Sequence, residues 1–331
     1  MQLKINHELN ISEDLFNANI KKASIRDGFG QALVDLAEKF EDIVVLTGDL
    51  SESTRVLEFA EKYPGRFIEV GIAEQNMAGI AAGLALTGKI PIVASYAAFN
   101  PGRNWEQIKD SICYSDANVK IIGAHGGYAS GVHGATHQAL EDIALTRVLP
   151  NMTVLIPADF IQAQKALEEA IKVDGPVYLR LSRSDTPVFT TKKTPFVVGQ
   201  AQILKEGSDI TVIACGPLVY EALLAARELG LKFNIDVEII NCHSIKPMMD
   251  MHIINSVKKT NLVITIEEHQ ISGGLGSVIS ELLSEKYPTK IHRMGSKDKF
   301  GESGLYEELI EKNGLTKEHI IKEVRELVGK K

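Results

Sequence analysis

The side chains best suited to proton transfer in this chain are one glutamate and three histidines. Glu74 opens a helical pattern at residues 74–86 that is rich in Ala and Gly and follows an expected strand. An acid at this place is also common for electrostatic reasons alone, because it complements the helix dipole. Small residues four apart let another backbone approach closely. We therefore expect this helix to pack tightly, inside its domain or across a subunit interface.

The histidines His125, His133 and His137 lie in a glycine-rich segment, residues 123–142. Such loops at the carboxyl ends of parallel strands are where open α/β sheets bind ligands. A metal site is one interpretation, since His133 and His137 are four apart. The neighbouring glycines favour a loop over a helix, however, and no Cys or carboxylate completes the spacing. Polar histidines facing a ligand are the better interpretation.

The elements that would position these residues alternate between near-continuous apolar runs and helical patterns, which predicts an α/β fold with a doubly wound, mostly parallel sheet. The expected strands are residues 42–48, 67–71, 90–95, 119–124, 152–158 and 177–182. The expected helices are residues 31–40, 74–86, 105–114, 137–147 and 161–171. Asp159 followed by Gln162 resembles a capping box for the last of these helices.

Residues 188–198 contain clustered Thr, Lys and Pro with no helical period, which is typical of a surface linker. We place a first domain at residues 1–187 and a second, smaller α/β domain with its own sheet at 199–331. The second domain contains a glycine turn, SGGLG, at residues 272–276. This turn lacks the context of a nucleotide-binding loop, so a tight turn into a helix is expected.

Composition excludes several classes of partner. The formal net charge is −7 and no run of Lys or Arg occurs, so neither nucleic acid nor an anionic membrane is expected as a partner. The first residues have no apolar leader pattern, and a cytoplasmic protein is expected. The three cysteines are far apart and form no CxxC pair, which favours buried reduced thiols over disulfides or a zinc site.

Several blocks in sequence resemble the pyrimidine-binding domain of transketolases. In order they read VGIAEQNMAGIAAGLA, PIVASYAAF, HGATHQALEDIALTRVLPNMTVLIPAD and LRLSR. Two later blocks, GSDITVIACGPLVYEALLAA and EEHQISGGLGS, resemble the last domain of that family. The resemblance covers roughly the whole chain. It implies a thiamine-diphosphate-dependent enzyme that transfers a two-carbon ketol unit from a ketose to an aldose.

The resemblance also implies roles for residues around the cofactor. Glu74 resembles the glutamate that hydrogen-bonds N1′ of the aminopyrimidine, and so serves proton exchange. Phe99, with Tyr96 nearby, resembles the aromatic wall that stacks on the pyrimidine; for either ring, a plain core position is the alternative. His137 resembles the histidine that faces the substrate's hydroxyl and carbonyl oxygens.

The substrate's anionic end is matched by a second set of residues. His125, Arg183 and Arg55 resemble groups that hold a sugar phosphate, a task suited to the bidentate fork of arginine. One place departs from the family, which more often has an acidic pair where Val132 and His133 stand here, with its Asp contacting a substrate hydroxyl as an acceptor. An imidazole can donate as well as accept and can add positive charge, so the preferred ketose is expected to differ from the usual ones.

The diphosphate half of the cofactor site is missing from the sequence. The family holds Mg²⁺ and the diphosphate with a GDG motif and a later Asn, and no GDG occurs in this chain. We therefore expect no metal ligand here and an obligatory partner, the N-terminal transketolase subunit with the diphosphate-binding domain. An α2β2 assembly with active sites at subunit interfaces is expected.

Three alternatives remain open. The β subunit of a 2-oxo acid dehydrogenase has similar domains and the same glutamate, although THQALEDIALTRVLPNM is transketolase-like. A deoxyxylulose-phosphate synthase is a third relative, but its chain is normally unsplit. A non-catalytic scaffold would keep the fold without the chemistry. Joint retention of Glu74, Phe99, His125, His137 and Arg183 favours an enzyme.

Overall fold

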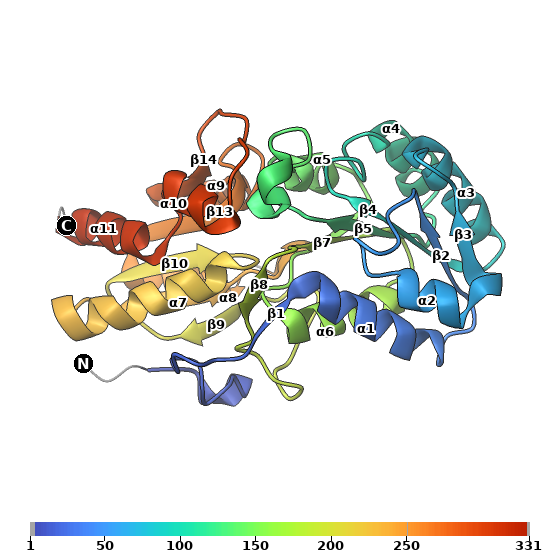
Figure 1. The fold of residues 1–331 in the computed structure, drawn as a ribbon. Helices are drawn as coiled ribbons and strands as arrows, with labels where there is room; N and C mark the ends of the chain where they lie inside the picture. The colour runs from blue at the N-terminus through green and yellow to red at the C-terminus, as the bar shows by residue number, and fades with distance from the viewer. Residues whose placement is uncertain (1–3, 250, 330–331) are drawn as a thin grey trace.

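Two α/β layers lie side by side in the computed structural model, which describes residues 4–249 and 251–329 (Figure 1). A seven-stranded sheet belongs to the first half of the chain and a five-stranded sheet to the second. Helices cover both, as buried parallel strands require. The predicted class, α/β with mostly parallel sheets, is confirmed.

The first sheet contains all six expected strands. In spatial order it consists of β12 (Ser244–Lys246), β6 (Thr153–Leu155), β7 (Val177–Leu181), β5 (Lys120–Ala124), β4 (Ile90–Tyr96), β2 (Ile43–Thr47) and β3 (Phe67–Glu69). The strands from β6 to β3 pair in parallel, whereas β12 is antiparallel. This edge strand comes from the second half of the chain, so the second half's strands do not all stay in a sheet of their own. It covers the free edge of β6.

Three of the five helices expected in the first half depart from their predicted ranges, and α2 was not predicted. The helices are α1 (Ile25–Ala37), α2 (Leu57–Lys62), α3 (Glu74–Leu86), α4 (Trp105–Gln107), α5 (Asp142–Arg147) and α6 (Phe160–Lys172), with short helices η2 (Pro64–Arg66), η3 (Ile108–Cys113) and η4 (Tyr128–His133). The expected helix 105–114 is α4 followed by the π-helical η3.

Glycines explain the other two departures. Helix α1 begins six residues before the expected start, and Gly28 lets it touch α6, because a Cβ there would lie 2.2 Å from the Phe160 carbonyl oxygen. The helix expected from residue 137 begins only at Asp142. His137 instead donates its N–H to the Gly134 carbonyl in a turn. The predicted cap of α6 is confirmed, since Asp159 accepts the N–H of Gln162 at 2.9 Å.

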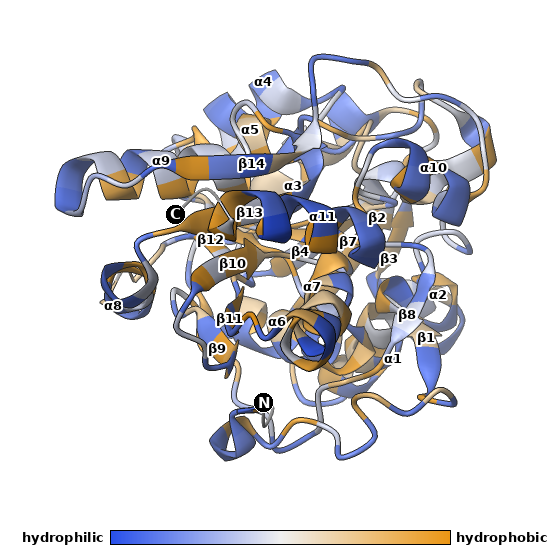
Figure 2. Cartoon of the chain, turned by 90° about the vertical axis from the view of Figure 1, so that its left-hand side faces the viewer, coloured by the Kyte–Doolittle hydropathy of each residue, from blue (hydrophilic) through white to orange (hydrophobic). Residues whose placement is uncertain are grey.

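The second sheet has the order β14 (Ile291–Ser296), β13 (Val263–Gln270), β10 (Ile210–Ala214), β11 (Val237–Asn241) and β9 (Gln202–Lys205). Its helices are α7 (Leu218–Glu228), η5 (Leu229–Phe233), α8 (Met251–Thr260), α9 (Leu275–Lys286), α10 (Tyr306–Lys312) and α11 (Lys317–Val328). Figure 2 shows hydrophobic strands β10, β11 and β13 at the centre of this half. The buried apolar side chains of α7 pack against these strands and form one core.

The two ends of the first half pair with each other, and the segment before them contacts the second half. The strand β1 (Lys22–Ser24) pairs antiparallel with β8 (Asp185–Pro187). Before β1, the segment that contains η1 (His7–Leu9) runs along the second sheet, where Ile5 forms a bridge with Lys205 and Leu15 joins the second core. All three cysteines are free and buried, as predicted. Within the described ranges, no helix has the length and apolarity to cross a membrane.

Candidate active site

The predicted site residues gather at the carboxyl-terminal ends of four parallel strands. Glu74 follows β3, Tyr96 and Phe99 lie at the end of β4, His125 directly follows β5, and Arg183 follows β7. These strand ends meet at one edge of the first sheet, the place where open α/β sheets bind ligands. The sequence prediction that these side chains share one region is therefore consistent with the topology.

Glu74 is a buried carboxylate covered by an exposed cation. It is the first residue of α3 and is 1% exposed. Its Oε2 accepts a hydrogen bond from Nη1 of Arg103 at 2.8 Å, while the Arg103 side chain is 45% exposed. The Arg103 guanidinium carbon also lies 4.4 Å from the centre of the Phe99 ring, within cation–π range. A side chain with this exposure can rotate into solvent, which would open the carboxylate to a ligand.

A layer of rings connects the two ends of the site. Tyr96 and Phe99 stack with centroids 5.9 Å apart. His125 lies 4.0 Å from Tyr96, and His137 lies 5.4 Å from Phe99 in an edge-to-face arrangement. The His133 ring is a further 5.4 Å from that of His137. The layer offers an apolar face bordered by imidazole nitrogen atoms, which suits a flat heteroaromatic ligand.

His125 is neutral and holds one unpaired nitrogen. Burial, and then the charges of Arg26 and Arg183, lower the pKa of His125 to about 2. Its Nε2 lies 3.4 Å from Nη1 of Arg26, and because a guanidinium can only donate, Nε2 is the acceptor and the proton is assigned to Nδ1. That nitrogen is buried and has no hydrogen-bond partner among the residues that the structure describes. It can donate to a bound ligand.

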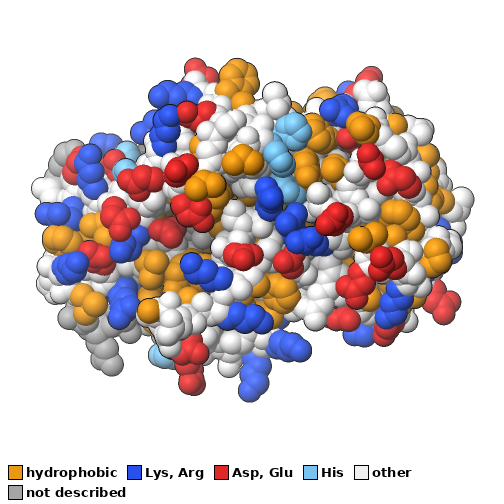
Figure 3. Space-filling view, in the orientation of Figure 1, with side chains coloured by type: hydrophobic (Ala, Val, Ile, Leu, Met, Phe, Trp, Pro, Cys, Tyr) orange, Lys and Arg blue, Asp and Glu red, His pale blue; other side chains and the backbone are white. Residues whose placement is uncertain are grey.

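Three arginines surround this histidine. Arg26 donates to the Ser53 carbonyl at 2.7 Å, and burial followed by the charge of Arg55 lowers the pKa of Arg26. Arg55 is held by Asp27 through a 2.6 Å ion pair. Arg183 borders a cavity of about 390 Å³. Figure 3 shows histidines grouped beside Lys and Arg side chains in the region where Figure 1 places α5 and β7. Such a cluster attracts an anion.

His133 and His137 lie nearer to solvent. His133 is exposed at the end of η4, and half-buried His137 contacts the Thr136 hydroxyl through Nδ1 at 2.9 Å. Across residues 4–249 and 251–329, no group of three or more His, Cys, Asp or Glu side chains is arranged to hold a metal ion. The neighbouring rings of His133 and His137 therefore lack a third ligand from this part of the chain.

Sequence reasoning missed Arg26 and Arg103. Neither belongs to a motif, and their site partners His125 and Glu74 lie 99 and 29 residues away along the chain. Only the tertiary fold brings these pairs together. A Lys or Arg directly next to a predicted site residue would have been a signal, but neither Arg26 nor Arg103 stands next to one.

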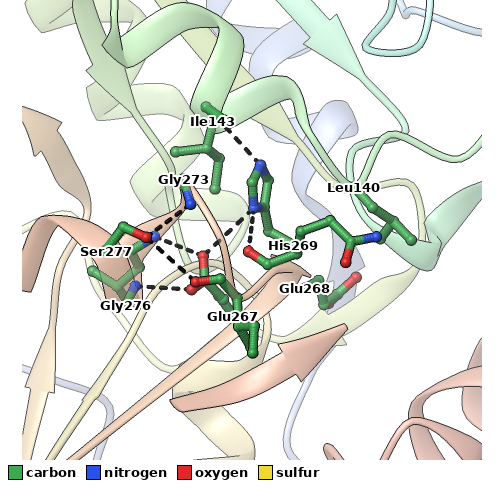
Figure 4. A network of polar contacts seen from close by, with 12 residues as sticks. Leu140, Ile143, Glu267, Glu268, His269, Gly273, Gly276 and Ser277 are labelled. Carbon is green, nitrogen blue, oxygen red and sulfur yellow. Dashed lines mark hydrogen bonds and ion pairs between the residues drawn. The ribbon is translucent and has the colours of Figure 1, made fainter. Parts of the chain in front are cut away.

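The glycine turn before α9 is not a ligand site. The Glu267 carboxylate accepts the N–H groups of Leu275 at 2.6 Å and of Gly276 at 2.8 Å (Figure 4). These are the first donors of α9, where a phosphate would otherwise bind. Burial raises the pKa of Glu267 to about 7. The chain's own carboxylate fills the position, and the predicted tight turn into a helix is confirmed.

Comparison with known proteins identifies the family. The chain matches the family models of the transketolase pyrimidine binding domain over residues 21–188 and of the transketolase C-terminal domain over residues 199–320. A 6-deoxy-6-sulfo-D-fructose transketolase subunit from a Clostridium species is 39% identical, over 96% of this chain and 98% of its own length. An apulose-4-phosphate transketolase subunit from Phocaeicola vulgatus is 39% identical, over 92% of this chain and 97% of its own length.

A solved structure is similar to the same extent. It is described as a split gene transketolase, inactive beta4 tetramer, and it shares 41% identity and a TM-score of 0.85 with this chain over 93% of this chain and 99% of its own. These relatives favour the transketolase interpretation over the dehydrogenase β subunit. The chain belongs to the thiamine-diphosphate-dependent transketolase family, as a subunit that carries the pyrimidine-binding and C-terminal domains of a split enzyme.

Proposed function

We propose that this chain binds the pyrimidine side of thiamine diphosphate and, together with a partner chain, transfers a two-carbon ketol unit from an anionic ketose to an aldose. The observation that carries this proposal is the arrangement of a buried carboxylate, a layer of rings and a cluster of arginines along one sheet edge. When bound, the cofactor supplies the electron sink for breaking and making a carbon–carbon bond.

The cofactor end of the site is Glu74 with Tyr96 and Phe99. Glu74 would hold a proton at N1′ of the aminopyrimidine, and the two rings would stack on that heterocycle. Its burial supports this role, because a carboxylate away from water binds a polar nitrogen more strongly. Arg103, which occupies Oε2 of Glu74 here, would turn toward solvent when the site is filled.

The substrate end is the arginine cluster. Arg183 and Arg55 would hold the terminal anion of the sugar together with Nδ1 of His125, and Arg26 would add a further positive charge. His137 would donate to, or exchange a proton with, the hydroxyl at the bond that breaks. His133 stands where a donor can reach a substrate hydroxyl or add charge near it, which favours a donor unlike the usual ketose phosphates.

The partner chain would hold Mg²⁺ and the diphosphate, in an α2β2 assembly. The outer face of α3 supports an interface there. Ile72 and Leu86 are 72% and 73% exposed, and a Cβ on Gly79 or Gly83 would meet no atom within 4 Å. On this open face, the backbone of a partner chain could approach α3 closely, as expected from its small residues. A boundary between the two domains at residues 188–198 is part of the same proposal, and the second domain would add to the interface.

Ketol transfer from a panel of phosphorylated and unphosphorylated ketoses tests this function. The chain is assayed alone and mixed with its partner, thiamine diphosphate and Mg²⁺. We expect transfer only in the mixture, and we expect Glu74→Gln to abolish it. The control is Glu285→Gln, a matched change at an exposed acid on α9, which should leave transfer at the wild-type level. Decarboxylation of a 2-oxo acid in place of transfer would contradict the proposal, as would full activity of Glu74→Gln.

A further inference from the structure

The end of β13 packs against the glycine-rich loop, residues 125–141, and forms hydrogen bonds with it. Three consecutive residues there bond to three different segments, and Figure 4 shows the contacts of the first and third of them, Glu267 and His269. Glu267 bonds to the start of α9, and Nε2 of His269 accepts the N–H of Ala144 at 3.4 Å. The side chain of Glu268 leaves the strand on a different side from that of Glu267. It is directed at the loop that carries the candidate substrate-binding histidines.

Each oxygen of Glu268 has a donor. Oε2 accepts the N–H of Tyr128 in the loop at 3.2 Å, and Oε1 accepts the hydroxyl of Tyr306 from α10 at 2.5 Å. The main-chain oxygen accepts Nη2 of Arg180 at 2.8 Å. The residue is buried, and this burial raises the pKa of Glu268. A buried carboxylate with both oxygens bonded has a fixed orientation.

The loop lies directly on this carboxylate. Gly127 has a left-handed φ of 73°, and a Cβ there would lie 2.4 Å from Oε2 of Glu268, so no side chain fits between them. From there the loop is tied to His137 by two further bonds. The Ser130 hydroxyl donates to the His137 carbonyl at 2.5 Å, and the His137 N–H donates to Gly134 at 3.1 Å. A chain of hydrogen bonds therefore connects the Glu268 carboxylate, through the loop backbone, to the main chain of His137.

We propose that Glu268 is a positioning residue of the active site, which holds the Tyr128 N–H so that the loop presents His137 to the ring layer. Tyr306 acts with it by fixing the second carboxylate oxygen. This inference rests on the proposed function, because it concerns the same site. It also gives the C-terminal half a part in positioning the site, through a side chain of β13.

Removal of the Glu268 carboxylate should therefore lower kcat in a chain that still folds. Glu268→Ala leaves the Tyr128 N–H and the Tyr306 hydroxyl without their acceptor. A misplacement of about 1 Å costs on the order of 10²-fold in rate, so we expect kcat to fall by roughly 10- to 100-fold. Glu268→Gln keeps one acceptor for Tyr128, and its amide can donate to the Tyr306 oxygen, so it should restore most of kcat.

The experiment combines amide hydrogen exchange of residues 126–138 with kcat and KM in the two-chain enzyme. The variants are Glu268→Ala, Glu268→Gln and Tyr306→Phe, with Tyr287→Phe as control, because its hydroxyl bonds to exposed Asn261 at the surface. We expect exchange at Tyr128 to rise about tenfold in Glu268→Ala, since one buried bond is lost. Tyr306→Phe should lie between wild type and Glu268→Ala, while Glu268→Gln and Tyr287→Phe should resemble wild type.

Unchanged exchange at Tyr128 in a folded Glu268→Ala chain would overturn the proposal. If that variant does not fold, Tyr306→Phe decides, and wild-type exchange and kcat in it would overturn the proposal equally. The exchange measurement does not require ketol transfer. Absence of transfer in the wild-type enzyme would count against the proposed function, while the exchange of the loop would still report whether Glu268 holds it.

Discussion

The turns after β5 and after β13 are built from similar residues and used in opposite ways. Both are rich in glycine and both follow the carboxyl end of a parallel strand, and a histidine lies close to each, His125 directly after β5 and His269 near the end of β13. After β5, Nδ1 of His125 is buried without a partner in the described chain, and His133 is exposed. At the end of β13, the Glu267 carboxylate accepts the first N–H groups of α9, and Glu268 has donors on both oxygens. Buried polar groups without a partner mark the candidate ligand site, whereas fully hydrogen-bonded polar groups mark the segment that holds the fold in place.

Two arginines on either side of the end of β7 repeat the contrast. Arg180 is buried and bonds to Asp142 at 2.7 Å and to the main chain of Glu268. Arg183, three residues later, is half-buried and borders the 390 Å³ cavity. The Arg180 guanidinium is committed to the fold, and we propose that the Arg183 guanidinium binds the ligand.

The largest difference is expected between two buried glutamates. Glu74→Gln should lower ketol transfer by about 10²- to 10⁴-fold, because a proton-transferring group is lost. Glu267→Gln should leave kcat nearly unchanged and instead cost about 1–3 kcal/mol of unfolding free energy, because an amide offers one oxygen to two N–H donors. Steady-state kinetics and urea unfolding of both variants measure this. A similar loss of kcat in the two would remove the distinction.

The arginine pair gives the next largest effect. Arg180→Met strands the buried Asp142 carboxylate and should cost about 3–5 kcal/mol of unfolding free energy. Arg183→Met should leave stability close to wild type and raise KM for a phosphorylated ketose by roughly 10- to 100-fold, since a charge-assisted hydrogen bond is worth about 1.5–3 kcal/mol. An uncharged ketose such as erythrulose is the control donor. Equal changes in KM for both donors would contradict a role for Arg183 in binding the anion.

A smaller effect is expected at His133. His133→Asp replaces an imidazole with a negative charge near the arginine cluster and should raise KM for anionic donors by about tenfold, with little effect on uncharged donors. Competition between several ketoses in one assay gives the order of preference. An unchanged order of donors would mean that this residue does not select the substrate.

A last difference is a pH dependence of stability that arises from Glu267 and not from the candidate site. Burial raises the folded-state pKa of Glu267 to about 7, above its value in the unfolded chain. Its contribution to stability is therefore present below about pH 4.5 and is lost as the pH rises through about 7. Wild type should lose more unfolding free energy than Glu267→Gln between pH 5 and pH 8. Equal losses in urea titrations of the two chains would show that Glu267 does not titrate in this window.

The sequence predicted those features that depend on local pattern. Apolar runs predicted six of the seven strands of the first sheet, and the family resemblance assigned Glu74, His125 and Arg183 to one site. Pairings between distant segments were not predictable. The pairing of β12 with the edge of the first sheet depends on how the two halves pack. The same is true of the contact between Glu268 and Tyr128, which are 140 residues apart.

We propose that this chain holds one half of a thiamine diphosphate site. Isothermal titration of the cofactor with Mg²⁺ into the chain alone, the partner alone and the mixture tests it most directly. We predict tight binding in the mixture, at least about tenfold weaker binding in either chain alone, and weaker binding in a mixture that contains Glu74→Ala. Equally tight binding by this chain alone would contradict the account, because it would mean that the diphosphate and its metal are held here.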